Sequence, residues 1–266
     1  MRPKIVLTIA GSDSCGGAGI QADLKTIAAH GCYGMSAITA LTAQNTRGVA
    51  AVHTPPARFL AAQLESVLSD FPPDAIKIGM LPDAACVRAV VAALREYQKR
   101  RRMLPVVLDP VMAAASGAPL ADEDAVAVMQ RELFPYVTLV TPNLREAEAL
   151  SGMCIASQED MEAAAPQICH TVLLKGGHRL SQAQGTEDEG ADDLLWYEGK
   201  LLWLRGRRVD AGETHGTGCT LSSAIACRMA QGHALPEAAK LAKGWLSWLL
   251  ADKPEFGVPN SPLLHR

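Results

Sequence analysis

Several signatures of function are missing from this 266-residue sequence. No stretch approaches the roughly 18 apolar residues that a membrane-spanning helix needs, so we expect no membrane partner. The first apolar run, residues 5–10, is too short for the core of a secretory signal peptide. The net charge of −3 argues against a nucleic-acid partner, because neutralising phosphates requires an excess of Lys and Arg.

Cysteine pairs at metal-binding spacing are also missing. The chain has seven cysteines, an odd number, and none of them forms a C-x-x-C pair. This pattern favours neither a zinc site nor a disulfide framework. Unpaired thiols are typical of a reducing compartment, so the sequence predicts a cytoplasmic protein. With 48% apolar and 20% charged residues, the composition is that of an ordinary globular chain.

The best-known nucleotide and hydrolase motifs are absent too. The sequence contains no G-x-x-x-x-G-K-[ST] phosphate loop, no H-E-x-x-H and no G-x-S-x-G. No G-x-G-x-x-G follows the first predicted strand, and Leu221 stands where a third glycine would follow Gly216 and Gly218. These absences disfavour P-loop enzymes, the common zinc proteases and serine hydrolases, and nicotinamide-dependent oxidoreductases.

Short β-branched runs alternate with longer helical patterns along the chain. We expect strands at residues 5–10, 35–41, 75–78, 106–108, 137–140 and 171–174, and helices at 21–30, 57–70, 83–102, 121–133 and 144–150. Two runs of period two, residues 194–197 and 201–204, predict an antiparallel hairpin. The alternation predicts an α/β fold whose mostly parallel central sheet is covered on both faces, in a single domain spanning residues 1–266.

Polar clusters follow the predicted strands. They lie around Gly11, Gln44, Gly79, Asp109, Asn143 and Lys175. Parallel sheets place their sites at the carboxyl ends of the strands, so these clusters predict where the site lies. Residues 181–192 are acidic and rich in Gly and Gln, which predicts a mobile loop, with a lid as the alternative.

The strongest local signal is Glu213-Thr-His-Gly-Thr-Gly-Cys-Thr220, which precedes a helical pattern. Its two glycines allow a tight turn that exposes the backbone amides of Gly216, Thr217, Gly218 and Cys219. Free amides at the start of a helix bind anions, with the helix dipole adding to the attraction. Such a site could stabilise the charge that develops on a transferring phosphoryl group.

Cys219 would lie in the first turn of that helix, where the pKa of a thiol falls. Its thiolate could then act as general base toward a substrate hydroxyl. The alternative is a glycine-rich helix entry with a small buried cysteine. His215 is interpreted as a turn residue rather than a base.

The remaining candidates each have a structural alternative. Gln44 offers a donor and an acceptor that match the edge of an aminopyrimidine, or it ties down a loop. Asp23 contacts substrate or complements a helix N-terminus. Asp109, Asn143 and Glu146 could hold Mg²⁺ and its waters, or serve as a strand-end turn and a helix capping box. Lys175 could pair with phosphates or lie in solvent.

Together these segments resemble the hydroxymethylpyrimidine/phosphomethylpyrimidine kinases of the ribokinase-like superfamily. The resemblance spans about residues 4 to 250 and rests on seven collinear segments: A-G-S-D-S-C-G-G-A-G-I-Q-A-D-L-K-T from Ala10, I-T-A-L-T-A-Q-N-T from Ile38, K-I-G-M-L from Lys77, L-D-P-V-M from Leu108, T-P-N-L-R-E-A-E-A-L from Thr141, L-L-K-G-G-H from Leu173 and T-H-G-T-G-C-T-L-S from Thr214.

The resemblance implies a three-layer α/β/α sandwich, ATP and Mg²⁺ as cofactors, a homodimer, and two successive phosphorylations of 4-amino-5-hydroxymethyl-2-methylpyrimidine in thiamine biosynthesis. It implies these site residues: Gln44 binds the pyrimidine, with Gly11, Asp23 and Met80 beside it; Gly216, Thr217, Gly218 and Cys219 form the anion hole; Lys175, Lys243 and Asp109 serve the nucleotide; and Asn143 and Glu146 serve the metal.

The sequence departs from the family pattern near this machinery. Ala115 stands where relatives usually carry Lys, and Ala118 where Asp often follows, which predicts a weaker second phosphorylation. Glu213 stands where relatives more often carry Asn or Asp, and Cys15 stands where they usually carry Gly. Two rival functions stay open: pyridoxal kinase activity, because pyridoxal also carries a hydroxymethyl group on an aromatic ring, and non-catalytic binding of a thiamine precursor.

Overall fold

One nine-stranded sheet runs through the computed structural model, which describes residues 2–100, 104–114, 117–176, 190–209, 212, 214–254 and 256–266. Within these residues the strand order is β3-β2-β1-β4-β5-β6-β7-β8-β9. The parallel strands are β1 (Ile5–Asp13), β2 (Tyr33–Asn45), β4 (Ala75–Ile78), β5 (Val106–Leu108), β6 (Leu139–Val140) and β7 (Val172–Lys175). The antiparallel strands at the edges are β3 (Gly48–His53), β8 (Asp193–Tyr197) and β9 (Lys200–Leu204).

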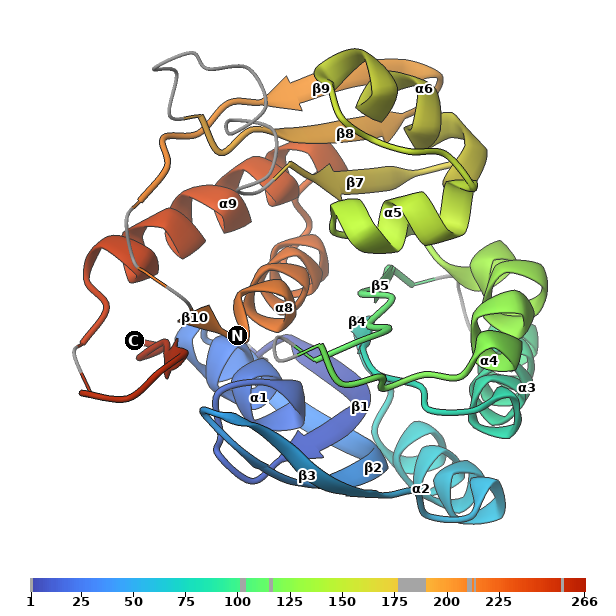
Figure 1. The fold of residues 1–266 in the computed structure, drawn as a ribbon. Helices are drawn as coiled ribbons and strands as arrows, with labels where there is room; N and C mark the ends of the chain where they lie inside the picture. Colours follow the sequence, from blue (N-terminus) through green and yellow to red (C-terminus); the bar gives the residue numbers. More distant parts are fainter. Residues whose placement is uncertain are drawn as a thin grey trace.

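Helices cover both faces of this sheet (Figure 1). One face carries α1 (Gly19–Ala29), α8 (Thr217–Ala230) and α9 (Leu235–Ala251), and the other carries α2 (Ala57–Asp70), α3 (Ala84–Arg100), α4 (Glu123–Val128), α5 (Leu144–Ser151) and α6 (Gln158–Ile168). After α4 the chain continues in a π-helical turn, Met129–Leu133, and a 3₁₀ turn, Phe134–Tyr136. The predicted α/β/α sandwich with a mostly parallel sheet is confirmed.

The two hydrophobic cores follow from side chains that alternate across each strand. In β1, Ile5, Leu7 and Ile9 belong to the core under α2 to α6, whereas Val6 belongs to the core under α1, α8 and α9. A strand that is buried on both faces has a continuous run of apolar residues, and the run at residues 5–10 predicts this strand.

Most elements agree with the sequence-based expectations, and α2, β4 and β5 have the predicted bounds. Three differences bear on the site. The second strand continues to Asn45, because β3 pairs with its polar end, so Gln44 lies within the strand rather than after it. The predicted strand 137–140 is reduced to two residues. A small parallel sheet of β10 (Thr214–His215) and β11 (Ser261–Pro262) was not predicted. Residues 181–189 of the proposed loop or lid lie outside the described residues.

A buried ion pair joins the sheet to the helices on one face. Lys77, at 0% exposure, lies in β4 with its Nζ 2.8 Å from both carboxylate oxygens of Asp23 in α1. Thr8 donates to the same carboxylate at 2.6 Å and Ser223 of α8 at 2.8 Å. Burial opposes the charge on Lys77, but Asp23 outweighs it and raises the pKa of the ammonium. The pair therefore holds β1, β4, α1 and α8 together.

Replacing one partner of this pair should destabilise the fold. In Lys77→Met the Asp23 carboxylate stays buried without its cation, which costs about 3–5 kcal/mol. Urea unfolding followed by circular dichroism measures the change. Lys4→Met is the matched control, because it removes the partly exposed pair between Lys4 and Asp74 and should shift the midpoint far less. Equal shifts in the two variants would contradict a stabilising role for the buried pair.

Candidate active site

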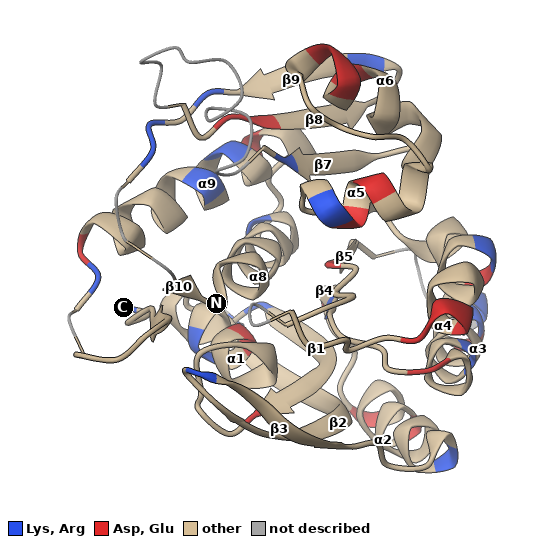
Figure 2. Cartoon of the chain, in the orientation of Figure 1, with Lys and Arg blue, Asp and Glu red and all other residues tan. Residues whose placement is uncertain are grey.

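A cavity of about 370 Å³ opens at the carboxyl ends of the central strands. Most of the candidate residues from the sequence line it: Gly11, Gln44, Met80, Asp109, Asn143, Glu146, Lys175, Gly216, Thr217, Gly218 and Cys219. Figure 2 shows charged residues at the ends of β5 and β7 and at the start of α5, around this part of the molecule. The fold thus brings together segments that are up to two hundred residues apart in the chain.

A second cavity of about 180 Å³ lies next to the first. Lys243 of α9 lines it and donates to Asp193 Oδ2 at 2.6 Å and to the Ala191 carbonyl oxygen at 2.5 Å. Both cavities are lined by Lys175, Thr217 and Gly218. The start of α8 and the Lys175 ammonium therefore lie between two separate spaces.

The first turn of α8 depends on glycine. Gly216 caps the helix with φ of 84°, in the left-handed region, and a Cβ there would collide with the Gly17 carbonyl oxygen. A Cβ on Gly218 would lie 3.2 Å from both Lys175 Nζ and Asp109 Oδ2. The first amides of a helix lack intrahelical acceptors, so this turn directs unpaired donors and the positive end of the dipole toward the cavities.

Cys219 lies in this first turn, but its thiol is not activated as predicted. Burial raises its pKa to about 11, and although Lys77 opposes this effect, Asp23 and Asp109 strengthen it. The expectation of a lowered pKa is therefore wrong. The reason is that desolvation and two nearby carboxylates outweigh the helix dipole, so the side chain is a neutral thiol near pH 7.

Asp109, Lys175 and Glu146 form a buried charged group. Lys175 Nζ donates to Asp109 Oδ1 at 2.9 Å, and Thr141 donates to the same oxygen at 3.2 Å. Burial disfavours the charge on Lys175, but Asp109 and Glu146 outweigh it, so its pKa is raised and it remains an ammonium. Burial raises the pKa of Glu146 to about 7; Lys175 opposes this change and Asp109 adds to it. Two carboxyl groups here share one cation.

Asn143 and Glu146 form the predicted capping box at the start of α5. Asn143 Oδ1 accepts from the Glu146 amide at 2.9 Å, and Glu146 Oε2 accepts from the Asn143 amide at 2.8 Å. In the described part of the chain, no group of three or more His, Cys, Asp or Glu side chains could hold a metal ion. A divalent cation here would need oxygens from a bound phosphate to complete its ligands.

Asp23 does not take the predicted place beside a substrate. Its side chain is completely buried, does not line the cavity, and is engaged by Thr8, Lys77 and Ser223. It also lies beyond the first turn of α1, so it does not complement that N-terminus. The sequence could not show this, because its partners come from three other elements.

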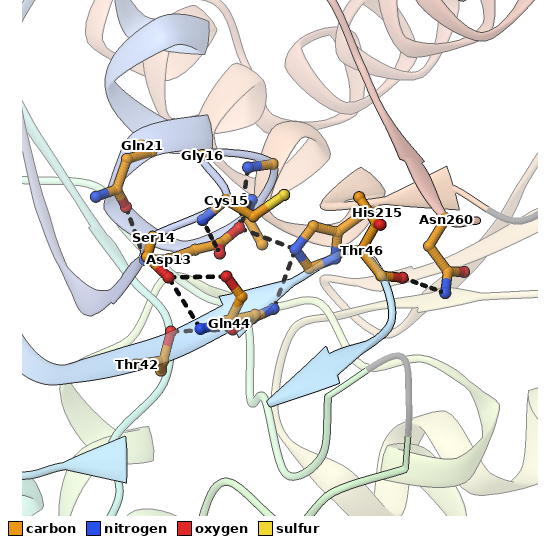
Figure 3. Close-up of polar contacts among 12 residues, drawn as sticks. Asp13, Ser14, Cys15, Gly16, Gln21, Thr42, Gln44, Thr46, His215 and Asn260 are labelled. Carbon is orange, nitrogen blue, oxygen red and sulfur yellow. Dashed lines mark hydrogen bonds and ion pairs between the residues drawn. The ribbon is translucent and has the colours of Figure 1, made fainter. Parts of the chain in front are cut away.

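Asp13 and His215 are among the cavity residues that were not predicted from the sequence. His215 Nε2 lies 2.9 Å from Asp13 Oδ2 and 3.1 Å from Gln44 Nε2, so the residue interpreted as a turn is part of a buried polar cluster (Figure 3). The available signals were the position of Asp13 just before the Gly16-Gly17 pair and that of His215 just before Gly216. Ala115 and Glu213, two of the departures from the family, lie outside the described residues.

The reactivity of Cys219 tests its raised pKa. Iodoacetamide reacts with thiolates, so alkylation of Cys219 should be slower than that of the exposed Cys154 at pH 8 and should rise about tenfold per pH unit up to about pH 11. Peptide mass spectrometry after timed labelling measures both cysteines in one sample. Fast labelling of Cys219 at pH 7 with a plateau below pH 9 would contradict a neutral thiol.

Comparison with known proteins identifies the family. The phosphomethylpyrimidine kinase family profile matches residues 13–263. A hydroxymethylpyrimidine/phosphomethylpyrimidine kinase of Rhizobium meliloti is 46% identical over 268 residues, which cover 98% of this chain and 96% of that protein. A thiamine biosynthesis bifunctional protein, ThiED, of Geobacter sulfurreducens is 47% identical over 98% of this chain, and the chain spans only 52% of its length.

The chain also resembles a solved structure of a kinase with ligands bound. The pyridoxal kinase from Staphylococcus aureus, in complex with AMP-PCP and pyridoxal, aligns with a TM-score of 0.83 at 33% identity, covering 98% of this chain and 92% of that one. The sequence relationship and the shared architecture lead to one conclusion. The chain belongs to the phosphomethylpyrimidine kinase family and is a phosphotransferase with the ribokinase-like fold.

Proposed function

We propose that this chain transfers a phosphoryl group from ATP to the hydroxymethyl group of 4-amino-5-hydroxymethyl-2-methylpyrimidine, and then a second one to the resulting monophosphate, in thiamine biosynthesis. The arrangement of the two cavities carries this proposal, because they meet at the start of α8 and at Lys175. The larger cavity would hold the pyrimidine and the smaller one the phosphate chain of ATP. The names of the relatives support the same substrates.

The larger cavity suits a small heteroaromatic ring. Gln44 supplies an amide whose donor and acceptor match an aminopyrimidine edge. Met80, at 7% exposure, supplies an apolar surface. Gly11 leaves room for the ring, because a Cβ there would lie 3.0 Å from Met80 Sδ. Arg145 of α5 also lines this cavity and adds a positive charge for a phosphorylated acceptor.

Phosphoryl transfer would take place at the start of α8. The acceptor oxygen forms a bond to the γ-phosphorus of ATP while the bond to the bridging β,γ oxygen breaks, and ADP leaves. The amides of residues 216–219 and the Lys175 ammonium stabilise the charge on the transferring group. Positioning and electrostatics should supply most of the rate, because such transition states need little covalent help.

The charges around Glu146 fit an additional cation. Asp109 and Glu146 are both buried near the Lys175 ammonium. Burial raises the pKa of Glu146 to about 7, and Asp109 adds to this effect. Within the proposal, Asn143 and Glu146 hold Mg²⁺ through its waters and the nucleotide phosphates complete the ligands. The ion would neutralise phosphate charge. Asp109 and Lys243 are proposed to lie near the nucleotide, Lys243 through the smaller cavity.

Pyridoxal phosphorylation is a second candidate, favoured by the similarity to the Staphylococcus aureus pyridoxal kinase. The homodimer, the cytoplasmic location, the single domain and the lack of a nucleic-acid partner stay predictions. Among the helices of the described ranges we find no candidate for a transmembrane segment.

Product masses over time test the main proposal. We incubate the purified protein with ATP, Mg²⁺ and hydroxymethylpyrimidine, with pyridoxal as the competing acceptor. Successive appearance of a monophosphate and a diphosphate of the pyrimidine is the expected result. Pyridoxal phosphate as the main product would favour the second candidate, and ligand binding without any ADP release would contradict both kinase activities.

The two steps together test whether Cys219 acts as a base. In the first step the alcohol must lose its proton when it is phosphorylated. In the second step the acceptor is the monophosphate, which is already almost fully deprotonated at pH 8 because its second pKa is about 6. Cys219 is a neutral thiol in the ligand-free protein, so it can take this proton only if it ionises in the complex with ATP and the acceptor. In that case Cys219→Ala should slow the first step at least about 100-fold and the second step much less. Single-turnover rates with each acceptor measure this, with the KM for ATP as the control. Equal losses in both steps, or a near-normal first step, would contradict the base assignment.

A further inference from the structure

A buried hydrogen-bonded cluster connects three segments at one side of the larger cavity (Figure 3). Asp13 comes from the end of β1, Gln44 from the end of β2 and His215 from β10. Asp13 and His215 are 3% and 7% exposed. Ser14 fixes the backbone of Gln44 from both sides: its hydroxyl donates to the Gln44 carbonyl at 2.8 Å and accepts from the Gln44 amide at 2.9 Å.

Asp13 is the anionic member of the cluster. Its oxygens accept from the backbone amides of Cys15 at 2.9 Å, Gly17 at 2.9 Å and Ala18 at 2.8 Å. Burial raises the pKa of Asp13, but the hydrogen bonds from His215, Ala18 and Cys15 outweigh it and the pKa lies below its usual value. An ionised carboxylate 2.9 Å from His215 Nε2 requires a hydrogen on that nitrogen.

The proton on His215 decides which way the Gln44 amide must face. Gln44 Nε2 lies 3.1 Å from His215 Nε2, and two N–H groups cannot bond to each other. At its other end, Gln44 Oε1 lies 3.1 Å from the Thr42 hydroxyl, which already donates to the Ser12 carbonyl at 2.9 Å. Rotating the amide by 180° removes both conflicts: the Gln44 oxygen then shares the single His215 Nε2–H with Asp13, and a Gln44 N–H donates to Thr42 Oγ1.

We propose that His215 and Asp13 are positioning residues that hold the Gln44 amide in this one orientation and thereby set the direction of the aminopyrimidine ring. The inference rests on the proposed function, in which Gln44 binds that ring. One amide N–H and one carbonyl lone pair remain for the ligand. They match the adjacent ring nitrogen and 4-amino group, so the amide can bind this edge through two hydrogen bonds.

The orientation matters because the reacting group lies next to the recognised edge. In the pyrimidine, the carbon that bears the hydroxymethyl group is bonded to the carbon that bears the amino group. With the amide reversed, the ring would bind turned over and its hydroxymethyl group would point elsewhere. His215 also immediately precedes Gly216, so the same residue connects ring recognition to the anion site at the start of α8.

Substitutions at His215 test the proposal through acceptor selectivity. In His215→Phe the ring remains but the hydrogen bond is lost, and kcat/KM for hydroxymethylpyrimidine should fall about 10- to 100-fold. The KM for ATP should stay within about twofold, because neither His215 nor Gln44 lines the smaller cavity. The preference for hydroxymethylpyrimidine over its analogue without the 4-amino group should fall by a similar factor. His215→Gln keeps an N–H donor, so it should restore part of the kcat/KM for hydroxymethylpyrimidine and part of the preference for the 4-amino group.

Two further variants keep the test decisive. His233→Phe is the matched control, because His233 lies in the turn between α8 and α9 and lines neither cavity. This variant should leave the kcat/KM for hydroxymethylpyrimidine and the amino-group preference unchanged. Thr42→Val removes the acceptor for the Gln44 N–H while keeping the shape of the side chain, so it should lower the amino-group preference even if His215→Phe fails to fold. Circular dichroism confirms folding of each variant.

The outcomes separate this inference from the proposed function. The inference would be overturned if the folded His215 variants lost equal kcat/KM for hydroxymethylpyrimidine and for its analogue without the 4-amino group, which would leave the amino-group preference unchanged. A raised KM for ATP in these variants would overturn it as well. If the wild type binds hydroxymethylpyrimidine without phosphorylating it, the proposed function fails. Calorimetric binding constants for hydroxymethylpyrimidine and for its analogue without the 4-amino group then test the inference directly. Failure of the wild type to bind hydroxymethylpyrimidine overturns it.

Discussion

The chain conformation at the start of α8 is the constraint on which the rest of the site depends. Gly216 must adopt a left-handed conformation against the Gly17 carbonyl, so that the next amides face the space between the two cavities. Two contacts fix this turn from different directions: the backbone of β10 pairs with β11, and Ser223 further along α8 donates to Asp23, which is paired with Lys77. Residues outside both cavities therefore help to determine where the proposed anion site lies.

The charges around this turn leave Lys175 as a cation and do not activate the Cys219 thiol. Lys175 stays charged because Asp109 and Glu146 lie close to it, and the pKa of Glu146 is raised to about 7 chiefly because the carboxyl group is buried. The same carboxylates and the loss of solvent keep Cys219 as a neutral thiol in the ligand-free protein. A nucleotide with its cation would change this balance, so binding and the protonation of these groups should be coupled.

Local patterns in the sequence predicted elements well, and long-range partners poorly. The bounds of α2 followed from its helical periodicity, and the capping box of α5 followed from Asn143 and Glu146, because both depend on neighbouring residues. The end of β2 was missed because its polar residues pair with β3. The bond between Asp13 and His215 joins residues 202 positions apart, and the burial of Asp23 depends on three other elements. For Cys219 the position in the helix was predicted correctly, whereas its surroundings, which set the pKa, could not be read from the sequence.

The central claim is that phosphoryl transfer takes place at the amides of residues 216–219, between an acceptor cavity and a nucleotide cavity. A crystal structure of the protein with ADP, Mg²⁺, aluminium fluoride and hydroxymethylpyrimidine tests it most directly, because the metal fluoride mimics the transferring group. The account predicts the fluoride against the first turn of α8 and Lys175, with the pyrimidine beside Gln44 and the ADP phosphates in the smaller cavity. A fluoride bound away from α8, or both ligands in one cavity, would contradict it.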